Sequence, residues 1–211
     1  MRSWAYAVRP ASAQAMMTSP CTIARVTRLT IAQCLLLALT ASPAAAQEDD
    51  LFARKAWHLE FQAHGAIETW NYNVSHENMA GPVLGFTYGV GKSTVLMVHA
   101  PLYYVEQRGP DAWLLGITWG VRSRFLRRDK WSAYWEFEVG VSKADAFTPP
   151  RGTRFNYLAL GAAGVSRRVS ASTHLLAGLK WVHVSNNSLA GRSRNPDIEA
   201  VGPHLAILHR F

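Results

Sequence analysis

Five polar residues near the end of the chain have types and spacing that suit hydrolytic chemistry. His183, Ser185 and Asn186 form a His-x-Ser-Asn run, and Asn195 and Glu199 follow it closely. A serine hydroxyl becomes a nucleophile when a neighbouring base takes its proton, and histidine is the side chain that titrates nearest neutrality. A carboxylate can hold the imidazole in one tautomer and stabilise its cation. The pattern predicts acyl transfer with Ser185 as nucleophile, His183 as base and Glu199 as acid.

Acyl transfer also needs hydrogen-bond donors where negative charge develops on the carbonyl oxygen. Asn186 and Asn195, with backbone N–H groups of residues 186–191, are the candidates for forming or shaping that oxyanion site. Losing one such donor typically costs about 10²–10³ in rate. Asp197 is an alternative acid, because it has the same strand phase as Glu199. A His-x-Ser pair alone is common. The prediction therefore rests on two parts together: the run from His183 to Asn186, and Asn195 with Glu199 after the loop.

A strand that ends at Ser185 must position His183 and Ser185, the first part of this pattern. Side chains alternate between the two faces of a strand, so Trp181, His183 and Ser185 share one face, while Lys180 and Val182 lie on the other. The shared face is otherwise mostly apolar. Such a face is the core side of a soluble protein or the lipid side of a membrane barrel, and the two cases imply different functions.

Eight stretches of the chain show strand-like alternation and are rich in Trp, Tyr, Phe and Val. They fall at about residues 56–66, 83–90, 94–105, 112–125, 131–142, 153–165, 171–185 and 199–211. Large apolar side chains occupy one face, and small or charged side chains occupy the other. Strong helical periodicity is absent, and no later segment has the roughly 18 consecutive apolar residues expected of a transmembrane helix. The fold class is therefore predicted to be all-β.

Three features favour an outer-membrane barrel over a soluble lipocalin-like barrel. Tryptophans lie near strand ends, where a membrane-interface girdle requires them. Short and long connections alternate, as in exported barrels: the short ones are near 91–93, 126–130 and 166–170, and the long ones near 68–82, 106–111, 143–152 and 186–198. The terminal Phe211 resembles the assembly signal of bacterial outer-membrane barrels. Residues 47–211 are thus predicted to form an eight-stranded antiparallel transmembrane β-barrel, multi-pass in the bacterial outer membrane.

The inward face of such a barrel must fill a narrow bore. Charged residues of the inward phase can pair there, and we expect this of Arg122, Arg124, Glu136, Glu138 and Lys180. Most other histidines are expected to fill the bore as well, namely His58, His64, His99, His174 and His204.

The first 46 residues have the pattern of a secretory signal peptide. Arg25 and Arg28 precede an apolar run at 35–39, and a small-residue cleavage site follows at 44–46. The apolar run is shorter than the roughly 20 residues that span a membrane. Export of the mature chain is therefore predicted.

The start of the natural chain is either Met1 or one of Met16 and Met17.

Charge and cysteine content limit the class of protein. Four of the 22 Lys and Arg residues and none of the 14 Asp and Glu residues precede residue 47, so the mature chain is only mildly basic. Both cysteines, Cys21 and Cys34, fall in the leader, so no disulfide framework is expected. We expect no metal site, no cofactor and no nucleic-acid partner.

The mature chain resembles the outer-membrane lipid A 3-O-deacylases of the PagL type. The specific likeness is the His183-x-Ser185-Asn186 run with Asn195 and Glu199, set on the last strands of an eight-stranded barrel. The resemblance implies an outward-facing Ser-His-Glu triad that hydrolyses the ester-linked 3-O-hydroxyacyl chain of lipid A. It implies that Ser185 is the nucleophile, His183 the base and Glu199 the acid, with Asn186 and Asn195 in the oxyanion or site-shaping set.

A site on the outside of a barrel can meet only molecules in the same leaflet, which in the outer leaflet means chiefly lipopolysaccharide. Its phosphates suit the arginines in and beside the predicted outer loops, which are Arg108, Arg151, Arg154, Arg192 and Arg194. Lipopolysaccharide and outer-membrane lipid are therefore the expected partners, and a homodimer is compatible with the sequence. Two other functions stay open: a non-catalytic barrel for adhesion or envelope integrity, and a phospholipase or acyltransferase.

Overall fold

The computed structural model describes residues 50–70 and 76–211. The predicted signal peptide at 1–46 and the alternative starts at Met16 and Met17 lie outside the described residues. Within the described part, no helix is long enough and apolar enough to cross a membrane.

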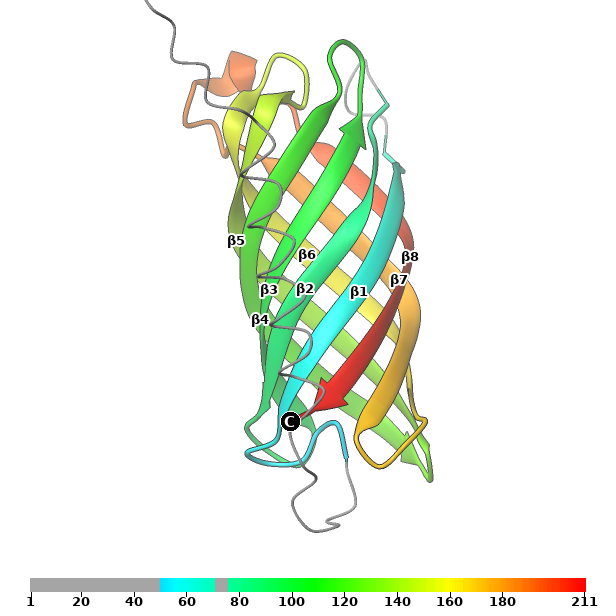
Figure 1. Ribbon diagram of the computed structural model, residues 1–211. Helices are drawn as coiled ribbons and strands as arrows, with labels where there is room; N and C mark the ends of the chain where they lie inside the picture. Colours follow the sequence, from blue (N-terminus) through cyan, green and yellow to red (C-terminus); the bar gives the residue numbers. More distant parts are fainter. Residues whose placement is uncertain (1–49, 71–75) are drawn as a thin grey trace, which may run out of the picture. The chain divides into compact units, whose positions relative to one another are not determined.

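Eight antiparallel strands close into a barrel in sequence order, with β1 pairing both β2 and β8 (Figure 1). Their bounds are β1 Trp57–Glu68, β2 Asn78–Gly89, β3 Thr94–Glu106, β4 Ala112–Arg128, β5 Trp131–Thr148, β6 Thr153–Arg168, β7 Thr173–Ser185 and β8 Ile198–Arg210. A short 3-10 helix, η1 Arg192–Arg194, lies in the last loop. The all-β fold and the eight predicted strands are confirmed.

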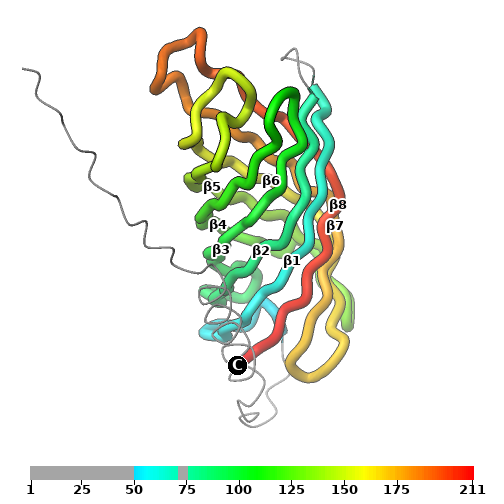
Figure 2. The backbone as a smooth tube through the Cα atoms, turned by 45° about the horizontal axis from the view of Figure 1, so that its top comes forward, coloured from blue at the N-terminus to red at the C-terminus, as the bar shows by residue number. Residues whose placement is uncertain are grey.

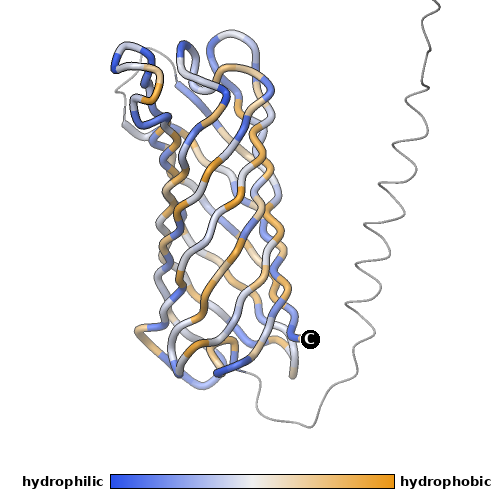
Figure 3. The backbone as a smooth tube through the Cα atoms, turned by 90° about the vertical axis from the view of Figure 1, so that its left-hand side faces the viewer, coloured by the Kyte–Doolittle hydropathy of each residue, from blue (hydrophilic) through white to orange (hydrophobic). Residues whose placement is uncertain are grey.

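The alternation of side chains gives the wall an apolar outside and a polar inside. On β5, Trp135, Phe137 and Val139 are exposed, whereas Glu136 and Glu138 are buried. Hydrophilic and hydrophobic residues alternate along the strands of the wall (Figure 3). A soluble barrel would bury its apolar face, so the lipocalin-like alternative is wrong, and the exposed apolar wall is the lipid-facing surface of a transmembrane barrel.

Charged side chains pair with one another inside the bore. The Arg122 guanidinium donates to both carboxylate oxygens of Glu60 at 2.9 and 3.0 Å, and its Nε donates to Glu136 at 2.7 Å. Lys180 Nζ lies 2.8 Å from Glu136 and 3.2 Å from Glu138. The five histidines expected in the bore are all buried. The predicted inward pairing of Arg122, Glu136, Glu138 and Lys180 is therefore confirmed.

The two rims of the barrel differ in their connections. The connections at 90–93, 129–130 and 169–172 share one rim with Phe211 and with the start of the described chain. The opposite rim carries those at 107–111, 149–152 and 186–197, together with the end of β1 and the start of β2. Short turns lie on the periplasmic side of exported barrels, so the second rim is the outer one. Arg124, expected inside the bore, lies at the periplasmic rim, where its Nη1 is 2.8 Å from Asp50.

Two predicted long loops are wrong in their bounds. Strand β2 begins at Asn78, within the predicted loop 68–82. Strands β5 and β6 extend to Thr148 and Thr153, which leaves only four residues of the predicted loop 143–152. The reason is that the strands continue as a hairpin beyond the wall, where Thr148 pairs with Thr153 and the Asn156 amide donates to the Thr148 carbonyl at 2.7 Å. This hairpin and the β7–β8 loop rise together at the outer rim (Figure 2).

Candidate active site

Strands β7 and β8 bring the two halves of the polar pattern together. Their antiparallel register sets His183 opposite Glu199, and Trp181 opposite Val201. On β7, Lys180, Val182 and Val184 point into the bore and are buried. His183 and Glu199 have the opposite phase and therefore face outward, at the outer end of the wall.

A continuous hydrogen-bonded chain joins three of the predicted site residues. His183 Nε2 lies 2.8 Å from the hydroxyl oxygen of Ser185, and His183 Nδ1 lies 2.7 Å from Oε1 of Glu199. An ionised carboxylate can only accept, so Nδ1 carries the proton that it donates to Glu199. The unprotonated Nε2 is then free to accept the Ser185 hydroxyl proton. The arrangement is chemically suited to general-base activation of a serine.

Trp181 is a functional candidate that the sequence argument did not include. Its indole Nε1 donates to Oε2 of Glu199 at 2.5 Å, so both carboxylate oxygens have a donor. The indole stacks on the His183 ring with centroids 6.1 Å apart and an interplanar angle of 26°. It also covers Gly161 on β6, where an added Cβ would lie 3.6 Å from the indole. Its position two residues before His183, in the same phase, is the signal that would have identified it.

The trio is partly accessible from outside the barrel. The exposed fraction is 27% for the His183 side chain and 18% for the Glu199 side chain, whereas Ser185 is 7% exposed. On β6, Tyr157 lies opposite Ser185 and the small Ala159 lies opposite His183. Because Ala159 is small, the His183 imidazole stays accessible from the surrounding membrane leaflet.

Asn186 and Asn195 tie the β7–β8 loop to the end of β7. The backbone N–H of Asn186 donates to Oδ1 of Asn195 at 3.1 Å, and its side-chain amide donates to the carbonyl of Arg194. These groups are engaged within the loop and thereby shape the edge of the site. The chain then turns through Asn187 and Ser188, whose φ values are 49° and 61°. Among the described contacts their N–H groups make no hydrogen bond, so these two stay candidates among the backbone donors predicted at 186–191.

Asp197, the alternative acid, lies close to the trio but is not the imidazole's hydrogen-bond partner. His183, Asp197 and Glu199 each offer one possible metal-ligand atom, and these atoms lie within 4.8 Å of one another. Both ring nitrogens of His183 already contact protein oxygens, Nδ1 with Glu199 and Nε2 with Ser185. A metal ion would have to replace one of these contacts, so the geometry favours a hydrogen-bonded trio.

Two of the five loop arginines form a cationic group beside the site. The guanidinium carbons of Arg154 and Arg194 lie 5.6 and 5.9 Å from the ring centroid of Phe147, in the β5–β6 hairpin. Arg194 also donates to the carbonyl of Gly152 at 3.5 Å, which links the hairpin to the β7–β8 loop. Arg108, Arg151 and Arg192 are exposed and take no part in this group.

Comparison with known proteins supports the fold. No protein-family model matches the chain, and no curated protein matches its sequence. The crystal structure of Neisserial surface protein A has a TM-score of 0.58 at 14% identity, over 74% of this chain and 97% of that one. The outer membrane protein OprG from Pseudomonas aeruginosa has a TM-score of 0.48 at 12% identity, over 77% of this chain and 99% of that one. The first likeness confirms a small outer-membrane-type barrel.

Proposed function

We propose that this protein is a serine esterase that hydrolyses the 3-O-linked acyl chain of lipid A in the outer leaflet, as its resemblance to the PagL-type deacylases implies. The observation that carries the proposal is the hydrogen-bonded chain from Ser185 through His183 to Glu199, with distances of 2.8 and 2.7 Å, on the lipid-facing wall. Polar groups on such a wall cost free energy unless they are paired or lie near the interface. The trio meets both conditions, and its hydrogen-bonded chain ends at a serine hydroxyl that a base can activate, which supports a catalytic role.

The proposed reaction has two halves. In the first, His183 Nε2 takes the Ser185 proton as the hydroxyl oxygen attacks the ester carbonyl, and the ester C–O bond then breaks. The proton passes from His183 to the departing sugar hydroxyl, and the acyl chain remains on Ser185. In the second, His183 deprotonates a water that attacks the acyl-serine, which releases the fatty acid and restores the Ser185 hydroxyl. Glu199 keeps Nδ1 protonated and stabilises the imidazolium in both halves.

The choice of lipid A rests on location and charge. An ester that meets His183 from outside the barrel must belong to a lipid of the outer leaflet, at the depth where the wall meets the loops. The guanidinium groups of Arg154 and Arg194 lie just beyond the wall and are suited to a phosphate of the lipid A disaccharide. An anionic phosphosugar ester therefore fits the surroundings of the trio.

The test is mass spectrometry of lipid A from cells that produce either the wild-type protein or Ser185→Ala. We expect wild-type lipid A to lose one hydroxyacyl group and the variant lipid A to keep it. Unchanged lipid A in wild-type cells, with the barrel folded in the outer membrane, would contradict the proposal and favour a non-catalytic barrel. Purified protein with phospholipid as the sole lipid tests the remaining alternative, because a phospholipase would produce lysophospholipid there.

A further inference from the structure

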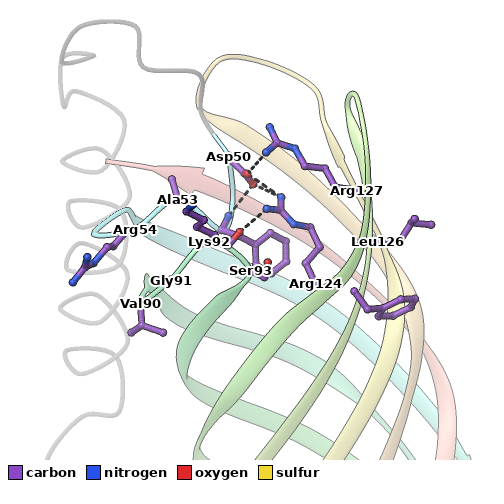
Figure 4. A pocket seen from close by; sticks show the side chains of 12 residues that line it. Asp50, Ala53, Arg54, Val90, Gly91, Lys92, Ser93, Arg124, Leu126 and Arg127 are labelled. Atoms are coloured by element: carbon purple, nitrogen blue, oxygen red, sulfur yellow. Dashed lines mark hydrogen bonds and ion pairs between the residues drawn. The ribbon is translucent and has the colours of Figure 1, made fainter.

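A pocket lies at the periplasmic rim, opposite the rim that carries the trio. It has a volume of about 710 Å³ and is formed by the chain before β1, the β2–β3 turn and the end of β4 (Figure 4). Residues of both chemical kinds line it: the charged Asp50, Arg54, Lys92, Arg124 and Arg127, and the apolar Phe52, Val90, Phe125 and Leu126. None of them belongs to the outward trio or its loops.

The pocket carries an excess of positive charge. Asp50 is the one carboxylate among the described lining residues. It accepts both of its 2.8 Å hydrogen bonds from Arg124, while Arg127 is 3.5 Å from the same group and 57% exposed. Figure 4 shows these two guanidinium groups converging on Asp50. Arg54 and Lys92 are exposed, and the described part of the chain provides no carboxylate partner for them. Among the described lining residues, Asp50 therefore balances only one of four cationic side chains.

A β-bulge gives the same pocket a hydrophobic edge. The register between β4 and β5 shifts between Arg124 and Leu126, so Phe125 is an extra residue in the strand. Two consecutive apolar side chains consequently face outward, with Phe125 67% exposed and Leu126 47% exposed. Val90, from the neighbouring turn, is 40% exposed. Cationic and apolar groups thus meet where the lipid-facing wall ends.

We propose that this pocket binds an anionic glycerophospholipid of the periplasmic leaflet. Lys92 and Arg127 are the groups that would contact the phosphodiester, and Arg54, which points away from Asp50 in Figure 4, would add to the positive charge of the rim. Basic residues at a membrane surface attract anionic head groups. Phe125 and Leu126 would lie against the first part of an acyl chain. Arg124 is 7% exposed and paired with Asp50, so we assign it to holding the chain before β1 in place. A soluble anion would leave the apolar edge unused, which favours a lipid as the ligand.

The experiment is native mass spectrometry of the full barrel with equimolar phosphatidylglycerol and phosphatidylethanolamine of identical acyl chains. The test variant is Arg54→Gln/Lys92→Gln/Arg127→Gln. The matched control is Arg108→Gln/Arg151→Gln/Arg192→Gln, which removes the same charge from the outer rim. Circular dichroism establishes that each variant is folded, and sn-glycerol 3-phosphate serves as a head group without chains.

We expect the wild type and the outer-rim control to retain phosphatidylglycerol in preference to phosphatidylethanolamine. The periplasmic variant should lose this preference, by roughly fivefold for each cation removed. Equal loss in the control would assign the preference to net charge and overturn the proposal. So would an undiminished preference in the folded periplasmic variant, or binding of sn-glycerol 3-phosphate as tight as that of the lipid. None of these readouts depends on the proposed esterase activity.

Discussion

Two polar clusters share strand β7 and differ in the face they occupy. Lys180 points inward, is 1% exposed and joins Gln62, Glu136 and Glu138 in a network that fills the bore. Three residues later, His183 points outward, 27% exposed, and its hydrogen-bonded chain ends at the Ser185 hydroxyl. Buried charges that satisfy one another hold the bore in a single arrangement, whereas a chain that ends at a hydroxyl can act on another molecule. Strand phase therefore separates residues that stabilise the barrel from residues available for chemistry.

The largest expected difference comes from comparing the outward Ser185 with a serine that faces inward. Ser185→Ala should lower the rate of acyl release by about 10⁴-fold or more, because the nucleophile is lost. Ser166→Ala, at a buried inward position, should leave the rate unchanged. Release of the hydroxyacyl chain from purified lipopolysaccharide measures both, and a Ser185→Ala protein as active as the wild type would show that Ser185 is not the nucleophile.

A second comparison concerns the acid. Glu199→Gln keeps the shape of the side chain but makes the wrong imidazole tautomer accessible, so the rate should fall by about 10²–10⁴-fold. Asp197→Asn is the matched control, because Asp197 is close to the trio without being the Nδ1 partner. We expect it to change the rate by less than about tenfold. The opposite ranking in initial rates would identify Asp197 as the acid.

A substitution in the bore should change the stability of the barrel and leave the reaction rate unchanged. Lys180→Met leaves Glu136 and Glu138 without their shared cation, and breaking a buried pair by removing one partner typically costs about 3–5 kcal/mol. Tryptophan fluorescence during denaturant unfolding measures this loss. Activity per folded molecule should be retained, since Lys180 lies on the opposite face from His183. An unchanged unfolding midpoint would show that the network does not stabilise the barrel.

The smallest expected effect is that of Trp181→Phe. The substitution keeps an aromatic ring over Gly161 but removes the indole N–H that Glu199 accepts. Hydrogen bonds to charged groups contribute about 1.5–3 kcal/mol, so we expect a loss of roughly tenfold or somewhat more in kcat. In the Glu199→Gln background the same substitution should have little further effect, because the two residues act through one contact. Full additivity in this double-mutant cycle would exclude a shared role.

Alternation along the chain was enough to predict the strands and the two faces of the wall. Period-two patterning assigned Glu136, Glu138 and Lys180 to the bore, and the structure confirms this. The same phase put His183 and Glu199 on one outward face, although their catalytic roles stay predictions. Hairpin contacts beyond the wall were not predictable, because β5 and β6 continue there through pairing of Thr148 with Thr153 and not through apolar alternation.

The sequence argument paired His183 with Glu199 across two strands but missed the contact of Trp181 with the same carboxylate, although Trp181 has the same outward phase. The donation from Trp181 to Glu199 depends on the register of β7 against β8, which no local pattern specifies. Similarly, Asn186 and Asn195 were expected to form or shape an oxyanion site, and their mutual hydrogen bond became visible only when the loop was folded. The bulge at Phe125 breaks the alternation by a single residue, and a pattern-based strand continues through it unnoticed.

The outward phase of His183 has a kinetic consequence. In the proposed esterase, a lipid substrate would reach that imidazole by lateral diffusion within one leaflet. Encounters would then occur in two dimensions and depend on mole fraction at the surface, not on bulk concentration. Turnover measured in micelles should therefore fall as inert detergent is added at constant amounts of protein and lipid. Arg122 and Lys180, which pair with carboxylates inside the bore, take no part in that encounter.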